Sequence, residues 1–249
     1  MSTAVAAGRI FERDTLGTLT HSAPVPALPA ALRRLVPDRV RDDVRLRAVS
    51  VGLGAIPPRA LHSAEDVALL RSLARGCARV VEIGVYEGAS AVVLCEELDP
   101  SAELHLIDPF GEQPGALRRG WAATEWATRR VVARACRDGA SSPRVVWHVG
   151  FSADVARGWP PGAPVDLVFV DGDHLEPGVR LDWELWSPLV APGGHVLFHD
   201  ARLGRPEGRG LPGPTAVVDA LFRAPAAAAP DWEIVAEIDR CVAVRRRRP

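Results

Sequence analysis

The clearest pattern along the chain is a series of short apolar runs separated by stretches with helical spacing. Five such runs lie in the middle of the chain, over residues 79–84, 103–108, 144–149, 165–171 and 195–200. Helices are predicted between them, over residues 89–98, about 117–137 and about 179–189. Short apolar strands that alternate with helices are typical of a parallel sheet covered on both faces.

The pattern changes near the C-terminus. Residues 232–237 and 241–245 predict two strands joined by a tight turn, and therefore an antiparallel hairpin. With the five earlier runs, the hairpin gives an α/β fold: a mostly parallel, seven-stranded sheet with helices on both faces.

The N-terminal part differs from the rest. Residues 1–62 are rich in Ala, Pro and Arg, which predicts an arm or cap with short helices. Ser63 is a good helix N-cap, with Asp66 in the following turn, so the main domain is expected over residues 63–249.

Composition narrows the functional classes. The net charge is −1, so neither nucleic acid nor an acidic membrane is expected as a partner. All 30 Lys and Arg positions are Arg, and Asn is absent too, which excludes a lysine base and an asparagine metal ligand. The four Cys are widely spaced and are expected to be buried thiols. No signal-like segment precedes the domain, so a cytoplasmic location is expected.

A glycine-containing loop follows the first predicted strand, with the spacing Glu-x-Gly-x-x-x-Gly. It differs from the Gly-x-Gly-x-x-Gly of dinucleotide-binding folds, and its acidic residue would repel a phosphate. A cationic ligand without phosphate, S-adenosylmethionine (SAM), suits it better; the alternative is an ordinary tight turn. The candidate cofactor-binding residues here are Glu82, Gly84, Tyr86, Gly88 and Ser90.

Three further residues at strand ends are candidates for the same ligand. Asp108 ends the second run, where an acid can bind ribose hydroxyls; a turn former is the alternative. Phe151 and Ser152 follow the third run and are candidates for the adenine pocket, although Ser152 could also cap the next helix.

Titratable residues are concentrated after the fourth and fifth runs. Both runs end at one edge of the predicted sheet, so five side chains should meet there: Asp171, Asp173, His174, His199 and Asp200. So many ionisable groups require a compensating cation or substrate.

Three segments, residues 80–90, 166–174 and 186–200, resemble the class I SAM-dependent methyltransferases, in particular the macrocin and mycinamicin type of antibiotic sugar O-methyltransferase. The resemblance covers about residues 65–222 and implies a Rossmann-like fold. It also implies that Asp171 and Asp200 bind a divalent metal, Mg²⁺ or Mn²⁺, with Asp171 also bordering the cofactor, and that His174 is the general base, with Asp173 beside it. His199 stands where an acid is usual, and imidazole suits Mn²⁺, Fe²⁺ or Zn²⁺ better than Mg²⁺.

The resulting hypothesis is methyl transfer from SAM to a hydroxyl of a small molecule, a sugar or other polyhydroxy natural product of bacterial secondary metabolism. Methylation of nitrogen or carboxyl groups, a non-catalytic SAM-binding module and a dinucleotide oxidoreductase are the alternatives, and homo-oligomer formation stays open.

Residues 109–137 carry Arg and Trp side chains that could grip the acceptor, with solvent-facing Arg as the alternative. Residues 202–214 are expected to form a lid.

Overall fold

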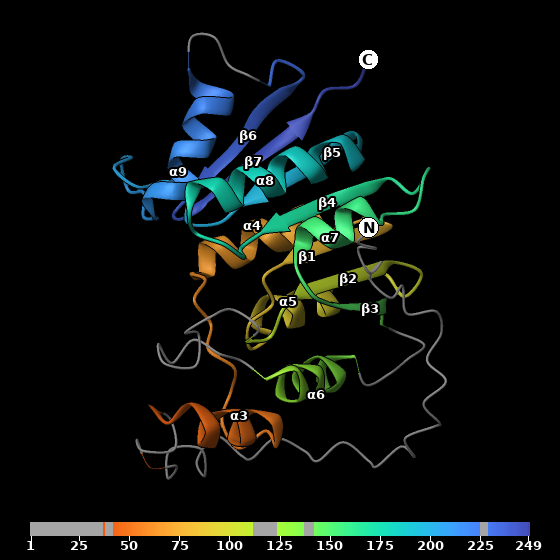
Figure 1. Cartoon of the computed structure of the whole chain (residues 1–249), viewed down its shortest axis with the longest axis vertical. Helices are drawn as coiled ribbons and strands as arrows, with labels where there is room; N and C mark the ends of the chain where they lie inside the picture. Colours follow the sequence, from red (N-terminus) through yellow and green to blue (C-terminus); the bar gives the residue numbers. More distant parts are fainter. Residues whose placement is uncertain (1–36, 38–41, 112–123, 137–141, 225–228) are drawn as a thin grey trace, which may run out of the picture.

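The computed structural model describes residue 37 and residues 42–111, 124–136, 142–224 and 229–249. Its centre is a seven-stranded sheet in the order β3-β2-β1-β4-β5-β7-β6 (Figure 1). The strands are β1 (Arg79–Ile83), β2 (Glu103–Asp108), β3 (Arg144–Val149), β4 (Val165–Val170), β5 (Val190–Phe198), β6 (Trp232–Ile238) and β7 (Cys241–Arg246). Strands β1 to β5 are parallel, and β7 is antiparallel to both its neighbours, which confirms the predicted sheet.

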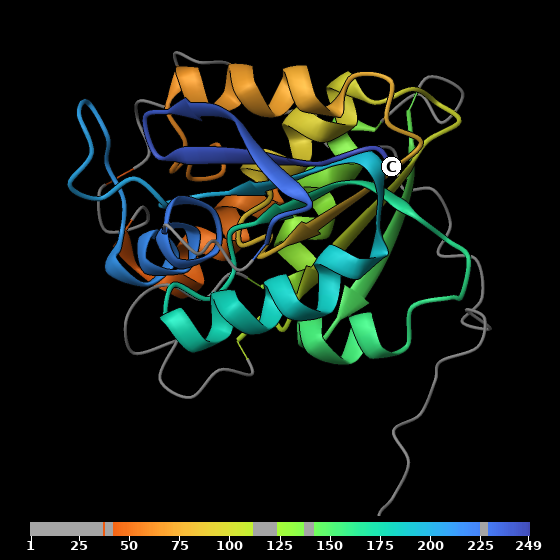
Figure 2. The ribbon, with the colours of Figure 1, turned by 90° about the horizontal axis from the view of Figure 1, so that it is seen from above.

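Helices cover both faces of the sheet (Figure 2). On one face lie α4 (Ala64–Ala74) and α5 (Ala89–Glu97), with α6 (Glu125–Ala135) beside α5. On the other lie α7 (Ser152–Arg157), α8 (Glu176–Trp186) and α9 (Pro212–Val218). Successive residues of the central strands serve opposite faces: Val80 packs in the α4–α5 core and Val81 in the α7–α9 core. The central strands are therefore mainly apolar on both faces, as is usual for parallel strands covered on both sides.

The N-terminal segment packs against the far side of α6. Helix α3 (Val44–Gly52) is capped by Asp43, which accepts hydrogen bonds from the amides of Arg45 and Leu46. Arg130 and Arg134 of α6 donate to the carbonyl of Gly52. Figure 1 shows α3 beside α6, at the opposite end of the molecule from the C-terminal hairpin. Of the Arg and Trp side chains expected to grip an acceptor, Arg130 thus serves helix docking, whereas Arg118, Arg119 and Trp121 lie outside the described residues.

Two boundaries differ from the sequence-based prediction. Strand β5 starts at Val190, ahead of the predicted 195, because a register irregularity between Val165 and Leu167 of β4 accommodates the intervening Pro and Gly residues. The expected lid overlaps the start of α9, which begins at Pro212; proline fits there because first-turn amides have no intrahelical partner. In the described parts of the chain, none of the helices is long and apolar enough to span a membrane.

Candidate functional site

The candidate site lies where the strand order of the sheet reverses, between β1 and β4, at the carboxyl ends of β1, β4 and β5. Open α/β sheets bind ligands at this kind of position. Gly84 follows β1 with φ +88°, and a Cβ on it would lie 2.3 Å from the main-chain oxygen of Asp171. Glycine is therefore required where the β1 loop passes the end of β4, whether or not a ligand is bound.

The loop after β1 is held by Asp108. Its carboxylate accepts hydrogen bonds from the amides of Val85 (2.9 Å), Tyr86 (2.8 Å) and Phe110 (2.7 Å). Burial raises the pKa of Asp108, against the lowering effect of these amides. Asp108 thus stabilises the turn, which was the alternative role considered from the sequence. Ribose binding by the same carboxylate stays a prediction. Gly88 ends the loop with φ +86° and starts α5.

Glu82 is fully buried at the end of β1. The Ser90 hydroxyl donates to its Oε1, and its Oε2 has no hydrogen-bond partner among the residues described. Burial raises the pKa of Glu82 to about 8, only partly offset by the Ser90 hydroxyl. A buried acceptor without a partner beside the glycine loop is a position that a cationic ligand would satisfy.

The turn after β3 exposes an aromatic ring. Phe151 is 46% exposed and precedes α7, and Val149 next to it is 47% exposed. The Ser152 hydroxyl donates to the carboxylate of Asp182 on α8, so it does not cap α7. The exposed ring suits the predicted adenine contact, and the role of Ser152 toward a ligand stays a prediction.

Four of the five predicted titratable residues meet beyond β4 and β5. His199 Nδ1 lies 2.9 Å from Asp171 Oδ1 and 3.6 Å from Asp200 Oδ2. His174 Nε2 lies 3.6 Å from Asp171 Oδ1 and 3.4 Å from Asp200 Oδ2. Asp200 has φ +53°, a left-handed conformation that is uncommon outside glycine and that is found most often at functional sites.

Asp173 is the fifth, and it serves the next helix. Its Oδ1 accepts a hydrogen bond from the amide of Leu175 (2.9 Å), and its Oδ2 occupies the space that a Cβ on Gly178 would need. An Asp that binds the amide two residues on favours the start of a helix. Asp173 therefore directs its carboxylate toward α8, and we do not include it in the catalytic group proposed below.

Three residues that sequence reasoning did not select join this cluster. His62 Nε2 hydrogen-bonds Asp171 Oδ2 (3.0 Å), and Arg240, in the turn of the C-terminal hairpin, donates to Asp200 Oδ1 (2.7 Å). Asp66 lies 3.8 Å from His199 Nε2 while it caps α4, so the capping signal in the sequence was correct but incomplete. No local signal marks His62, because Asp171 is 109 positions further along the chain.

The cluster is electrostatically balanced by its own side chains. Burial lowers the pKa of His199, but the charge and hydrogen bond of Asp171 outweigh it and raise the value to about 10. Hydrogen bonds to Asp171 and Asp200 raise the pKa of His174 to about 9. Burial raises the pKa of Asp171, and the surrounding imidazoles outweigh that effect and hold it well below its usual range. Without a bound cation, the carboxylates are therefore neutralised by protonated imidazoles.

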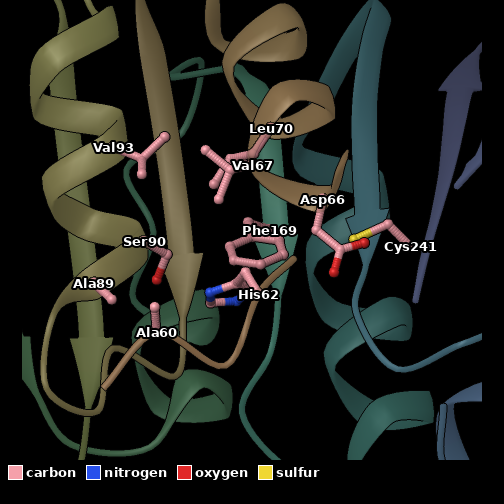
Figure 3. A pocket seen from close by; sticks show the side chains of 10 residues that line it. All are labelled: Ala60, His62, Asp66, Val67, Leu70, Ala89, Ser90, Val93, Phe169 and Cys241. Atoms are coloured by element: carbon pink, nitrogen blue, oxygen red, sulfur yellow. The ribbon is translucent and has the colours of Figure 1, made fainter. Parts of the chain in front are cut away.

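A small cavity of about 60 Å³ lies behind His62 (Figure 3). Figure 3 shows the His62 ring between Ser90 of α5 and Phe169 of β4, with Asp66 and Cys241 facing each other nearby. The remaining lining is mainly apolar and comes from Ala60, Val67, Leu70, Ala89 and Val93.

The donor set fits a divalent cation. Two groups of three residues have ligand atoms within 4.8 Å of one another and share Asp171: one with His174 and Asp200, the other with His62 and His199. His199 is 3% exposed, and its two ring nitrogens face carboxylates: Nδ1 lies 2.9 Å from Asp171 and Nε2 lies 3.8 Å from Asp66. Buried imidazole nitrogens next to a carboxylate are a common arrangement of metal ligands.

Comparisons with known proteins find similar sequences and folds among methyltransferases. Residues 81–201 match the family described as "Methyltransferase domain". The O-methyltransferase TomG from Streptomyces achromogenes, solved with SAM, is 22% identical with a TM-score of 0.57, over 84% of this chain and 91% of that one.

Two more solved structures are similar. The O-methyltransferase NovP is 19% identical with a TM-score of 0.56, over 88% of this chain and 97% of that one. An O-methyltransferase from Bacillus cereus, solved with SAH, is 16% identical with a TM-score of 0.55, over 85% of this chain and 93% of that one. Residues 81–201 are thus similar to a methyltransferase domain, and the chain has the same fold as these O-methyltransferase structures.

Proposed function

We propose that the protein transfers a methyl group from SAM to a hydroxyl of a small molecule. The observation that carries this proposal is the position of His174, whose imidazole lies 3.4–3.6 Å from the carboxylates of Asp171 and Asp200 at the strand ends beside the Gly84 loop. The His174 side chain is 40% exposed, whereas those of Asp171 and Asp200 are 14% and 9% exposed. The imidazole can therefore meet an acceptor that arrives from solvent, with the carboxylates behind it.

Methyl transfer from SAM requires few catalytic groups from the protein. SAM supplies a methyl group that is already activated, so the protein must position the acceptor and remove one proton. His174 is protonated when its carboxylate neighbours hold no cation, so a cation on Asp171 and Asp200 is needed to keep its imidazole neutral. In that state His174 Nε2 is the atom proposed to take the proton, and the two carboxylates stabilise the imidazolium that results. Asp171, Asp200 and His199 are the residues that would hold a divalent cation, which would lower the pKa of the acceptor hydroxyl.

The donor site is proposed from the loop after β1 and the ends of β2 and β3. Glu82, with its unpartnered Oε2, is proposed to face the cationic part of SAM, and Asp108 and Phe151 its ribose and adenine. Gly84, Tyr86, Gly88, Ser90 and Ser152 complete the predicted contacts. Glu82 also argues against a dinucleotide, because phosphates beside this carboxyl would oppose its ionisation, whereas a cationic ligand favours it.

Hydroxyl acceptors are favoured over carboxyl acceptors by the base at the site. A carboxyl acceptor is already ionised at neutral pH and needs no base, whereas a hydroxyl acceptor must lose a proton. The resemblance to antibiotic sugar enzymes, together with the role of TomG in tomaymycin synthesis, supports a polyhydroxy natural product as the acceptor. A non-catalytic binding module would have no need of the buried His–Asp cluster.

Two measurements test the proposal. Calorimetry should show binding of SAM and not of NAD; NAD binding without SAM binding would exclude methyl transfer. Incubation with SAM and a panel of sugars, phenols, amines and carboxylic acids, followed by mass spectrometry, should give methylated products from hydroxyl compounds. Methylation confined to amines or carboxylates would exclude the O-methyltransferase assignment.

A further inference from the structure

The N-terminal segment supplies a histidine to the candidate metal site. His62 lies just ahead of α4, and its side chain is 9% exposed. Its Nε2 lies 3.0 Å from Asp171 Oδ2, whereas His174 and His199 approach Oδ1 of the same carboxylate. The His62 and His199 rings are 4.6 Å apart between centroids and meet edge to face.

We propose that His62, Asp171 and His199 together form a two-histidine, one-carboxylate metal site that selects a transition-metal ion over Mg²⁺. This inference rests on the proposed function, since it specifies the cation of the same catalytic centre. It adds a ligand from outside the segments that resemble the antibiotic sugar enzymes and assigns the site a chemical preference.

The distances support coordination of one ion. Ligands bound at about 2.0–2.2 Å in adjacent positions lie roughly 3.0–3.5 Å apart. The two histidines lie 3.0 and 2.9 Å from the oxygens of Asp171, and the ligand atoms of all three residues lie within 4.8 Å of one another. His199 is buried and directs Nδ1 at Asp171, so an ion bound there would replace the proton between that nitrogen and the carboxylate.

The donor types decide which ion fits. Mg²⁺ prefers oxygen ligands and keeps several waters, whereas imidazole suits Zn²⁺, Fe²⁺ and Mn²⁺. Two imidazole nitrogens with one carboxylate form the ligand set of non-haem Fe²⁺ sites and resemble that of several Zn²⁺ sites. If the ion were held by Asp171, His174 and Asp200 without His62 and His199, more of its ligands would be oxygen atoms. Such a site would discriminate less between Mg²⁺ and Mn²⁺.

Metal binding can be measured without SAM or an acceptor. Metal-free full-length protein is titrated with Zn²⁺, Mn²⁺ or Mg²⁺ by calorimetry, in wild type, in His62→Gln and in the control His148→Gln on β3. Wild type and the control should bind Zn²⁺ and Mn²⁺ more tightly than Mg²⁺, and His62→Gln should lose a factor of at least about 10–100 in Zn²⁺ affinity. Unchanged Zn²⁺ affinity in His62→Gln, or tighter binding of Mg²⁺ than of Mn²⁺ by wild type, would overturn the proposal.

A second variant guards against loss of folding. In His62→Gly the space of the ring joins the neighbouring cavity, so added imidazole should enter and restore part of the Zn²⁺ affinity. A purely structural role of His62 predicts no such recovery. If wild type binds SAM but no metal, the metal site is wrong and methyl transfer stands; if it binds metal but not SAM, the proposed function fails instead.

Discussion

Arg240 Nη1 lies 2.7 Å from Asp200 Oδ1, so the turn of the C-terminal hairpin reaches the carboxyl end of β5 and neutralises one acid of the site. The same residue donates its main-chain amide to Asp66 Oδ1 at 3.2 Å. The hairpin that closes the sheet therefore also orders the polar side of the candidate active site.

Replacing Arg240 with Gln should release the Asp200 carboxylate while leaving the main-chain hydrogen bond in place. Because a hydrogen bond to a charged group is lost, the free energy of unfolding should fall by roughly 1–3 kcal/mol. We expect kcat/KM for the acceptor to fall and SAM affinity to change little. Denaturant unfolding and SAM calorimetry measure the two effects.

Arg245→Gln is the matched control for Arg240. Arg245 lies in the same hairpin and pairs with Glu233 at the surface, with 48% of its side chain exposed. Surface pairs of this kind contribute about 0–1 kcal/mol. Equal losses in the two variants would mean that the Arg240–Asp200 contact has no special role.

His174→Ala should lower kcat by about 10²–10⁴, the usual contribution of a general base. SAM affinity should stay near that of wild type, since His174 is proposed to contact the acceptor. His195→Ala is the control, because His195 is also on β5 but lies within the sheet, in register with Arg245 of β7, and is not among the proposed site residues. If His199→Ala abolishes turnover and His174→Ala does not, the base is on β5 and His174 has a positioning role.

The donor site can be tested by measuring whether Glu82 releases a proton when SAM binds. With a pKa of about 8, its carboxyl is protonated in the free protein at pH 7, and a cationic ligand beside it would favour ionisation. SAM binding at pH 7 should therefore release a proton, which appears as a dependence of the binding heat on the ionisation enthalpy of the buffer.

Glu82→Gln should remove that proton release and weaken SAM binding by at least about tenfold, equivalent to about 1.4 kcal/mol. Glu96→Gln, on the exposed side of α5, is the control and should behave as wild type. Proton release that persists in Glu82→Gln would assign the ionising group elsewhere.

The stacked pair formed by the buried His105 and the half-buried His148 should make the fold acid-sensitive. The rings stack with Nδ1 and Nε2 3.0 Å apart, and burial lowers the pKa of His105 to about 4. In the unfolded chain this residue takes up a proton near pH 6.5, whereas the folded protein does so only near pH 4. His105 therefore adds no penalty above pH 6.5, and the free energy of unfolding falls as the pH drops from 6.5 to 4.

Chemical denaturation at pH 7.5 and pH 5 tests this pH dependence. His105→Gln should show a smaller loss of stability between the two pH values than wild type does. An equal loss would show that other groups, such as the carboxylates of the site, carry the acid sensitivity.

The sequence predicted the sheet well because strand residues buried on both faces leave a continuous apolar run. Strand β2, for example, has the predicted bounds Glu103–Asp108. The sequence also predicted that Asp171 and Asp200 lie close together, since neighbouring parallel strands end at one edge of the sheet. The need for Gly84 was predicted for a different reason: the sequence suggested clearance for a ligand, and the structure shows contact with the main chain of Asp171.

The remaining contacts depend on tertiary packing that no local pattern encodes. His62 was assigned to a terminal arm, and Arg240 to a turn between two strands. Asp173 shares its motif with Asp171, yet the start of α8 directs its carboxylate elsewhere. Spacing along a strand end predicts which residues lie near a site, but the helix that follows decides which of them face it.

The buried pair formed by Arg47 and Glu87 connects α3 to the loop after β1. Glu87 binds the Arg47 guanidinium with both oxygens (2.6 and 2.7 Å) and also accepts from the amide of Arg59 (2.6 Å). Opening the loop would expose Glu87 and leave the Arg47 guanidinium and the Arg59 amide without their hydrogen-bond acceptor. We therefore expect α3 and the loop to open to solvent as one cooperative unit. Amide hydrogen exchange in α3 would then slow when a ligand occupies the loop, although α3 packs at the far end of the molecule from the C-terminal hairpin.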